Sequence, residues 1–190
     1  MKQLDLVLAL LKYKKFHVRK ASEILDLPVS SVLRIVDGLI SENVLDFNFE
    51  GRNKVFWLKR TLKARNYIFM AENYKLVKLL KKHPKLSHVF SSVLSKVKGE
   101  MVVLFGSYAK GLEKSTSDLD IYVNTSRNEI KESIELVYSK INVKIGRFDL
   151  NNYLVAEIVE DHVILQGFEE FYERTGFFKD TISKEKYPIS

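Results

Sequence analysis

The segment from Leu104 to Val123 constrains the fold of this 190-residue chain more than any other part of it. An apolar run ends at Phe105, Gly106-Ser107 follows, and a second apolar run begins just after Ser117. Glycine permits a positive φ or a close backbone approach, and the start of a helix favours anions. The pattern predicts a strand, a tight turn that can accept phosphate groups, and a second strand.

The second strand carries two acids, Asp118 and Asp120. Side chains alternate across a strand, so both carboxylates project from one face while Leu119 and Ile121 point into a core. Neighbouring carboxylates repel each other unless a cation neutralises them, and Mg²⁺ takes one or two carboxylates together with phosphate oxygens. Solvated acids on an exposed strand explain an isolated Asp-x-Asp, but the upstream turn favours a joint site for phosphates and divalent cations.

Gly106-Ser107, ten intervening residues and then Asp118-Leu119-Asp120 resemble the motif of the DNA polymerase β-type nucleotidyltransferase superfamily, above all its minimal nucleotidyltransferase members. The resemblance extends over roughly residues 101–175, and Gly111 and Ser117 also fit it. It implies an α/β domain in which Gly106, Ser107 and Ser117 bind a nucleoside triphosphate. It also implies that Asp118 and Asp120 are catalytic and bind Mg²⁺ or Mn²⁺. The motif is specific for the superfamily and not for the substrate.

Active members of this superfamily usually carry a third carboxylate on the next strand, which corresponds here to residues 141–148. Lys144 lies where that acid is expected, and its ammonium would meet a nucleotide phosphate as a point charge. Asp149 follows a few residues late, and it is either the third catalytic acid or a helix N-cap. Catalysis therefore stays open, whereas nucleotide and metal binding depend less on the third acid.

Composition bounds the remaining possibilities. A hydrophobic content of 46% supports packed cores, and the absence of cysteine excludes disulfides and thiol catalysis and is compatible with a reducing cytoplasm. The net charge of +7 is uneven: residues 61–99 hold nine Lys or Arg against one acid, whereas residues 100–190 hold 11 against 16. This distribution favours a front part that meets a polyanion, although solvated helix faces explain it equally well.

The apolar run at residues 6–11 predicts an amphipathic helix. It is too short to span a bilayer, and no small-residue cleavage site for a signal peptide follows it. We therefore expect a cytoplasmic protein without a membrane partner.

The first 60 residues predict three helices and a β-hairpin. The helical stripes lie near residues 4–11, 18–25 and 32–40, with Ser30 or its neighbour as the cap of the third, and strands at 44–49 and 54–58 flank a turn at 50–53. The arrangement resembles a winged helix-turn-helix, whose third helix enters the DNA major groove. That implies DNA contacts from Ser30, Ser31 and Arg34 on the third helix and from Arg52 and Lys54 on the wing.

Other uses of this module stay open, because winged helices also serve as protein-binding or dimerisation modules. Aromatic residues of the hairpin allow two interpretations. They either stack on bases or build the hairpin's inner face, and strand preferences favour the inner face. These residues are Phe47, Phe49, Phe56 and Trp57.

The chain is thus expected to be a two-domain α+β or α/β protein. The expected parts are a winged helix-turn-helix domain at 1–60, a helical linker at 61–99 and a polymerase β-like nucleotidyltransferase domain at 100–190. One functional hypothesis is transfer of a nucleoside monophosphate from a nucleoside triphosphate to a hydroxyl. The alternative is a DNA-binding transcriptional regulator whose degenerate second domain senses a nucleotide or binds a protein partner. A homodimer is also open.

Overall fold

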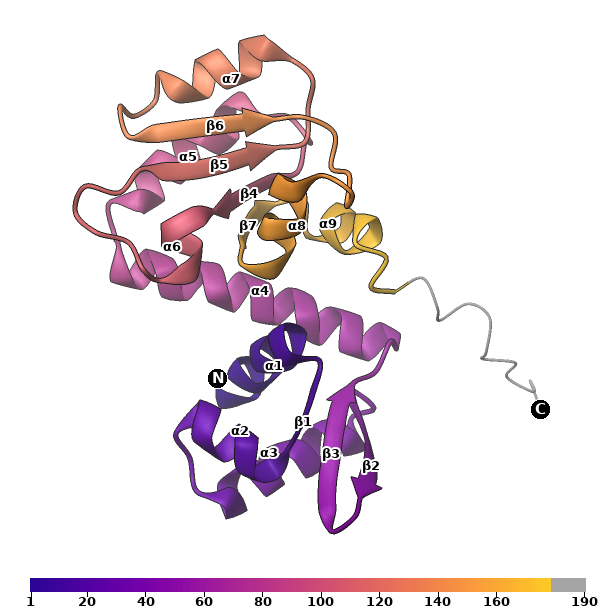
Figure 1. Cartoon of the computed structure of the whole chain (residues 1–190). Helices are drawn as coiled ribbons and strands as arrows, with labels where there is room; N and C mark the ends of the chain where they lie inside the picture. Colours follow the sequence, from indigo (N-terminus) through magenta and orange to yellow (C-terminus); the bar gives the residue numbers. More distant parts are fainter. Residues whose placement is uncertain (179–190) are drawn as a thin grey trace. The chain divides into compact units, whose positions relative to one another are not determined.

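The computed structural model describes residues 1–178. Within that range the chain forms two compact units, one made of residues 1–74 with Phe178 and the other of residues 75–177 (Figure 1). The long helix α4 (Leu62–Lys82) contributes residues to both units. The expected nucleotidyltransferase domain extends to residue 190, so its last twelve positions lie outside the described residues.

The first unit contains three helices and a small sheet. The helices are α1 (Lys2–Tyr13), α2 (Val18–Leu25) and α3 (Val29–Ser41), and the strands are β1 (Lys15–His17), β2 (Leu45–Glu50) and β3 (Asn53–Leu58). All pairings are antiparallel, in the order β1-β3-β2. Leu6, Val36 and Phe56 are fully buried in its core. The three predicted helices and the hairpin are present, since their apolar stripes can only be buried in these conformations.

Two details of this unit differ from the expectation. β1 was not predicted, because a three-residue strand depends on main-chain bonds to β3 and leaves no periodic pattern in the sequence. The N-cap of α3 is Pro28 rather than Ser30, and it makes no side-chain capping bond. Ser30 already lies in the first turn, because the helix begins at Val29.

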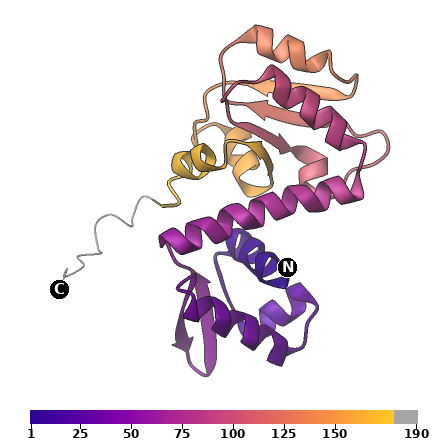
Figure 2. The same cartoon turned by 180° about the vertical axis from the view of Figure 1, so that it is seen from behind.

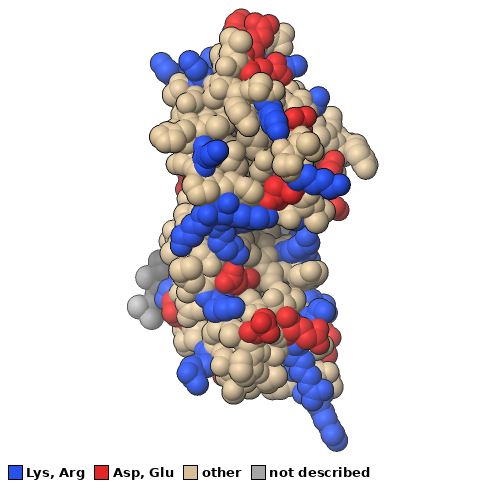
Figure 3. Space-filling view, turned by 90° about the vertical axis from the view of Figure 1, so that its left-hand side faces the viewer, with Lys and Arg blue, Asp and Glu red and all other residues tan. Residues whose placement is uncertain are grey.

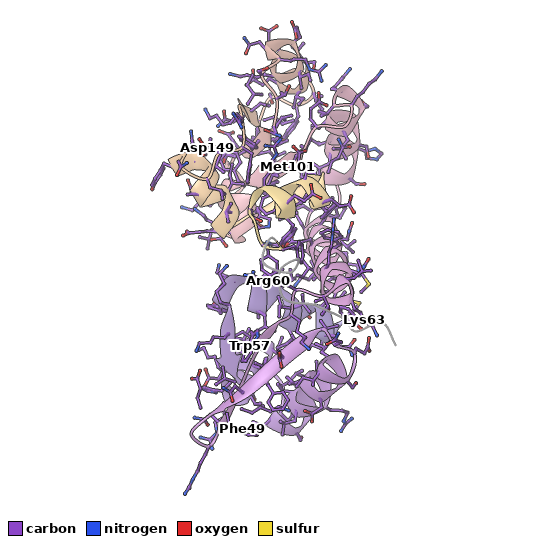
Figure 4. All side chains as sticks on the ribbon, turned by 90° about the vertical axis from the view of Figure 1, so that its right-hand side faces the viewer. Phe49, Trp57, Arg60, Lys63, Met101 and Asp149 are labelled. Carbon is purple, nitrogen blue, oxygen red and sulfur yellow. The ribbon has the colours of Figure 1, made fainter. Side chains whose placement is uncertain are left out.

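The hairpin aromatics also behave differently from one another. Phe47 and Phe49 share the core-facing side of the sheet with Phe56, but they are 37% and 62% exposed. Figure 4 shows Phe49 near the tip of the hairpin and Trp57 nearer its base. The expected inner-face position therefore holds for Phe56, Phe47 and the exposed Phe49. It is wrong for Trp57, because alternation along β3 places Trp57, the partner of Asp46, on the opposite face.

The second unit is built on a four-stranded mixed sheet in the order β6-β5-β4-β7. Its strands are β4 (Val102–Phe105), β5 (Leu119–Val123), β6 (Ile141–Ile145) and β7 (Val163–Gln166). Only the β5–β6 pairing is parallel, whereas β4 is antiparallel to both β5 and β7. The unit also contains α5 (Leu86–Lys96), α6 (Gly106–Lys110), α7 (Asn128–Glu135), α8 (Tyr153–Glu160) and α9 (Phe168–Arg174).

Alternation along the strands divides the sheet into two unlike faces. Leu104, Ile121 and Val143 lie on the face that packs on α5 and α7 in one buried apolar cluster, and Figure 2 shows α5 across this side. The opposite face carries Asp120 and Asn142 at one end of the sheet. No helix within residues 1–178 is long and apolar enough to cross a bilayer.

Candidate functional site

The Gly-Ser corner lies directly beside the second aspartate. Phe105, the last residue of β4, pairs with Asp120 of β5, and Gly106 then turns the chain with a φ of +70°. A Cβ placed on Gly106 would lie 3.2 Å from the Asp120 Cγ and closer still to its Oδ2. A side chain at position 106 would therefore displace the adjacent carboxylate and strain the backbone.

Asp120 has a second close neighbour on the adjacent strand. In the parallel register of β5 and β6, Asp120 is the partner of Asn142. The Asn142 Nδ2 donates a hydrogen bond of 2.9 Å to the Asp120 Oδ1. The Asp120 carboxylate is thus held by an amide on one oxygen while the other oxygen faces Gly106.

Asp118 is placed differently from Asp120. It immediately precedes β5, is exposed, and makes no hydrogen bond or ion pair within residues 1–178. The next residue is anchored, because the Leu119 N–H donates to the Lys140 carbonyl at 2.7 Å. The Asp118 carboxylate can therefore reorient at the anchored start of β5, whereas the Asp120 carboxylate two residues later is fixed.

The two serines of the motif have different surroundings. The Ser107 carbonyl accepts from the Leu112 N–H at 2.9 Å, and in the described part of the chain its hydroxyl makes no hydrogen bond. The Ser117 Oγ accepts from the Lys114 N–H at 2.9 Å and closes the loop before Asp118. Ser107 therefore has a hydroxyl available for a ligand, whereas Ser117 already holds its own loop together.

Neither candidate for the third position is the strand partner of Asp120. Lys144 pairs with Tyr122, two residues further along the strand than the Asn142–Asp120 pair, and is exposed. Asp149 is exposed in a turn in which its Oδ1 accepts from Asn151. It does not cap α8, because Asn152 is the N-cap and accepts from the Leu154 N–H. The neighbour of Asp120 is therefore Asn142, which shares a face of β6 with Lys144, so alternation along the strand does not distinguish the two.

The loop between α6 and β5 is anchored by a buried acid that the sequence analysis missed. The Glu113 side chain is only 5% exposed; it pairs with Lys82 and, at 2.7 Å, with His83. The Lys82 ammonium outweighs the cost of burial and lowers the pKa of Glu113 from 4.5 to about 2. An isolated Glu between Leu112 and Lys114 gives no pattern in the sequence from which this role could be read.

Two further contacts hold the surroundings of the site. The Lys110 Nζ at the end of α6 pairs with the Glu157 Oε1 of α8 at 2.7 Å, and this partner raises the pKa of Lys110. The Tyr122 hydroxyl donates to the Gly146 carbonyl at 2.8 Å, and burial raises the pKa of Tyr122 to about 12. The tyrosine therefore stays neutral and fixes the start of the loop after β6.

The oxygen ligands at this site suit a divalent cation that is also coordinated by waters and substrate phosphates. Mg²⁺ is commonly bound through one or two carboxylates together with waters and substrate phosphates, and Asp118 and Asp120 supply two carboxylates. The Asn142 carbonyl oxygen is a further hard donor on the same face. Within residues 1–178 no group of three or more His, Cys, Asp and Glu could hold a metal by itself.

The residues considered for DNA contact lie on the first unit. Ser30, Ser31 and Arg34 are in the N-terminal half of α3, and Arg52 is exposed in the turn between β2 and β3. Lys54 pairs with Asp37 of α3 at 2.7 Å and lies 4.3 Å from the centre of the Phe47 ring. Figure 3 shows Lys and Arg gathered near the C-terminal end of α4 and mixed with Asp and Glu elsewhere on that side.

A family model described as a nucleotidyltransferase domain matches residues 86–186, which is more than half of the chain. The chain belongs to the nucleotidyltransferase domain family. The match begins at Leu86, the first residue of α5, and includes all four strands of the mixed sheet. It confirms the superfamily that the Gly-Ser and Asp-x-Asp motifs indicate.

A relative supports the same assignment. Over 93 residues the chain is 33% identical to a protein of Methanocaldococcus jannaschii named "Putative protein adenylyltransferase". This alignment covers 46% of the chain and 74% of the relative. Nearly half of the chain therefore has a counterpart that makes up most of another protein.

Proposed function

We propose that the second unit transfers a nucleoside monophosphate from a nucleoside triphosphate to a hydroxyl acceptor with the help of Mg²⁺ or Mn²⁺. The observation that carries this proposal is the contact between the Gly106 corner and the Asp120 carboxylate, with the available Asp118 two residues away. A turn that accepts phosphates and a pair of acids that accept a cation are needed at one place for this reaction.

Each side of the site has its own task in the proposed reaction. The main chain at Gly106 and the Ser107 hydroxyl bind the triphosphate, while Asp118 and Asp120 would hold a divalent ion, which would supply positive charge to the phosphates. The acceptor oxygen bonds to the α-phosphorus as the bond to the β-phosphate oxygen breaks, so pyrophosphate leaves. The hydroxyl proton passes to solvent, because Asn142 at the adjacent position of β6 has no basic group to accept it.

The acceptor to test first is a protein hydroxyl, since the related archaeal protein is named as a protein adenylyltransferase. The full chain is incubated with each of the four nucleoside triphosphates labelled at the α-phosphate, with Mg²⁺ or Mn²⁺, and with candidate protein acceptors. Label should enter protein, and Asp118→Ala with Asp120→Ala should abolish this. A Gly111→Ala variant is the control for general damage, because the φ of +70° there adds backbone strain while nothing lies within 4 Å of a Cβ. Undiminished labelling by the double variant would contradict the site.

A second function is favoured by the order of elements in the first unit. Three helices followed by a hairpin, with a short strand completing an antiparallel sheet in the order β1-β3-β2, fit a winged helix-turn-helix that binds DNA. The exposed Arg34 on α3 and Arg52 in the hairpin turn are its contact candidates, with Ser30 and Ser31 beside Arg34. In this proposal the protein is a DNA-binding regulator and the second unit senses a nucleotide.

DNA binding is tested by measuring affinity of the full chain for duplex DNA over a range of salt concentrations. Each arginine that contacts a phosphate should lower the slope of log K against log salt by about 1 when it is replaced by methionine. Lys20→Met is the matched control, since Lys20 pairs with Glu23 on α2. Unchanged slopes for Arg34→Met and Arg52→Met, or no retention of DNA at low salt, would remove this proposal.

A further inference from the structure

We propose that Asn142 is a positioning residue that fixes the Asp120 side chain and limits the site to one bound divalent cation. The inference rests on the proposed metal-dependent function of this site and goes beyond it by assigning the number of ions. It concerns the place on β6 where an acid would lie beside Asp120, and where this chain has an amide instead.

The geometry shows how Asn142 acts on its neighbour. Its Nδ2 donates to the Asp120 Oδ1 at 2.9 Å, across the parallel β5–β6 pairing. The other oxygen, Oδ2, faces the backbone of Gly106 so closely that no Cβ fits there. The side chain of Asp120 therefore has little freedom to rotate, and one of its oxygens already has a donor. A carboxylate that bridges two cations uses both of its oxygens, and here the Asn142 amide occupies part of the acceptor capacity of Oδ1.

Charge leads to the same conclusion. Asp118 and Asp120 already place two negative charges two residues apart, and a carboxylate at position 142 would lie within hydrogen-bond distance of Asp120. Like charges that close are stable only when a cation or a proton separates them. The amide removes this repulsion and adds a hydrogen-bond donor, so the pair of side chains needs no second ion between them. Asp118 is exposed and has no partner in residues 1–178, so its carboxylate is able to move toward the one bound cation.

The direct measurement is Mn²⁺ binding to the full chain, followed by the electron paramagnetic resonance of free Mn²⁺. The titration is made with Mn²⁺ alone and with Mn²⁺ plus α,β-methylene-ATP, which cannot transfer its nucleotide. The native chain should bind one Mn²⁺, and Asn142→Asp should bind two in the presence of the analogue. Asn142→Ala should bind one Mn²⁺ about 10–100-fold more weakly, as is typical when the partner of a metal ligand is removed.

A second readout requires no nucleotide. In the presence of EDTA, Asn142→Asp should unfold at a lower temperature than the native chain, and saturating Mn²⁺ should raise its Tm more than that of the native chain. Asn48→Asp is the matched control, because it adds the same charge on a strand of the first unit. There the side-chain oxygen accepts from the Phe49 N–H, which an aspartate also does. The control should show neither the loss nor the extra gain.

The exchange variant with Asp120→Asn and Asn142→Asp provides the rescue test, because it keeps one carboxylate and one amide in the pair. It should bind one Mn²⁺ more tightly than Asn142→Ala. Two Mn²⁺ on the native chain, no Mn²⁺ on it, or unchanged affinity in Asn142→Ala would overturn the inference. One tightly bound Mn²⁺ without nucleotidyl transfer would support it and count against the proposed transferase function alone.

Discussion

Replacement of Gly106 by alanine should damage the candidate site through one defined contact. The new Cβ would fall 3.2 Å from the Asp120 Cγ and nearer still to Oδ2, at a residue whose φ is +70°. Asp120 can avoid it only by rotating, and rotation breaks the hydrogen bond from Asn142. The substitution therefore adds backbone strain and removes the positioning of the carboxylate at the same time.

The size of the effect follows from these two contributions. A left-handed conformation costs a non-glycine residue about 1–2 kcal/mol, and a hydrogen bond to a charged group contributes about 1.5–3 kcal/mol. The free energy of unfolding of the second unit should fall by about 2.5–5 kcal/mol. Gly111→Ala has the same φ of +70° with nothing within 4 Å of its Cβ, so it should lose only the first contribution.

Hydrogen–deuterium exchange of the β5 amides in the full chain measures this loss. Trp57 is the only tryptophan and lies in the first unit, so its fluorescence is an internal control that the substitution should leave unchanged. Mn²⁺ binding should weaken in Gly106→Ala and not in Gly111→Ala.

A double variant shows whether the contact itself is responsible. In an Asp120→Ala background the clash is absent, and Gly106→Ala should then lose no more stability than Gly111→Ala does. Equal losses for the two single glycine variants, or strict additivity of Gly106→Ala with Asp120→Ala, would refute the reasoning.

Two other predictions concern charged groups with known partners. The Lys82 ammonium holds the pKa of Glu113 at about 2, below its ordinary value of 4.5, so the unfolded chain takes up this proton first as the pH falls. Stability from this ion pair is complete above pH 4.5 and is lost toward pH 2, and Glu113→Gln should flatten that part of the pH dependence of thermal unfolding measured by circular dichroism. Lys54→Met removes the pair with the 60%-exposed Asp37 and should cost only about 0.2–1 kcal/mol in urea unfolding followed by Trp57 fluorescence. It should also leave the salt dependence of DNA affinity unchanged, in contrast to Arg52→Met, because Lys54 already has an acidic partner; a lowered slope would show that the ammonium leaves Asp37 for a phosphate.

Local pattern was sufficient for the elements and for part of the site. The apolar stripes of α1, α2 and α3 and the alternation in β5 predict helices and a strand without reference to the rest of the chain. The Gly-Ser turn and the two aspartates lie close in sequence, and the turn requires glycine for local reasons. The sequence therefore predicts the corner at Gly106 and the shared face of Asp118 and Asp120.

Long-range pairing determined the remaining part of the site. The sequence analysis placed Lys144 at the position of a third acid, whereas the β5–β6 register places Asn142 beside Asp120. A shift of one residue in strand pairing exchanges the faces, and a shift of two exchanges Asn142 with Lys144 on the same face. Such a shift conserves the alternation that the sequence shows, so alternation alone could not distinguish them.

By itself, then, the sequence determined the chemical groups of this nucleotidyltransferase domain and the two short segments that carry them. Tertiary structure alone decided that an amide adjoins Asp120, that Glu113 finds its partners about 30 residues away at the C-terminal end of α4, and that Phe49 is exposed. The physical reason is that side-chain chemistry and local periodicity are properties of neighbouring residues. Register, ion pairing and exposure depend on which distant segments pack against them.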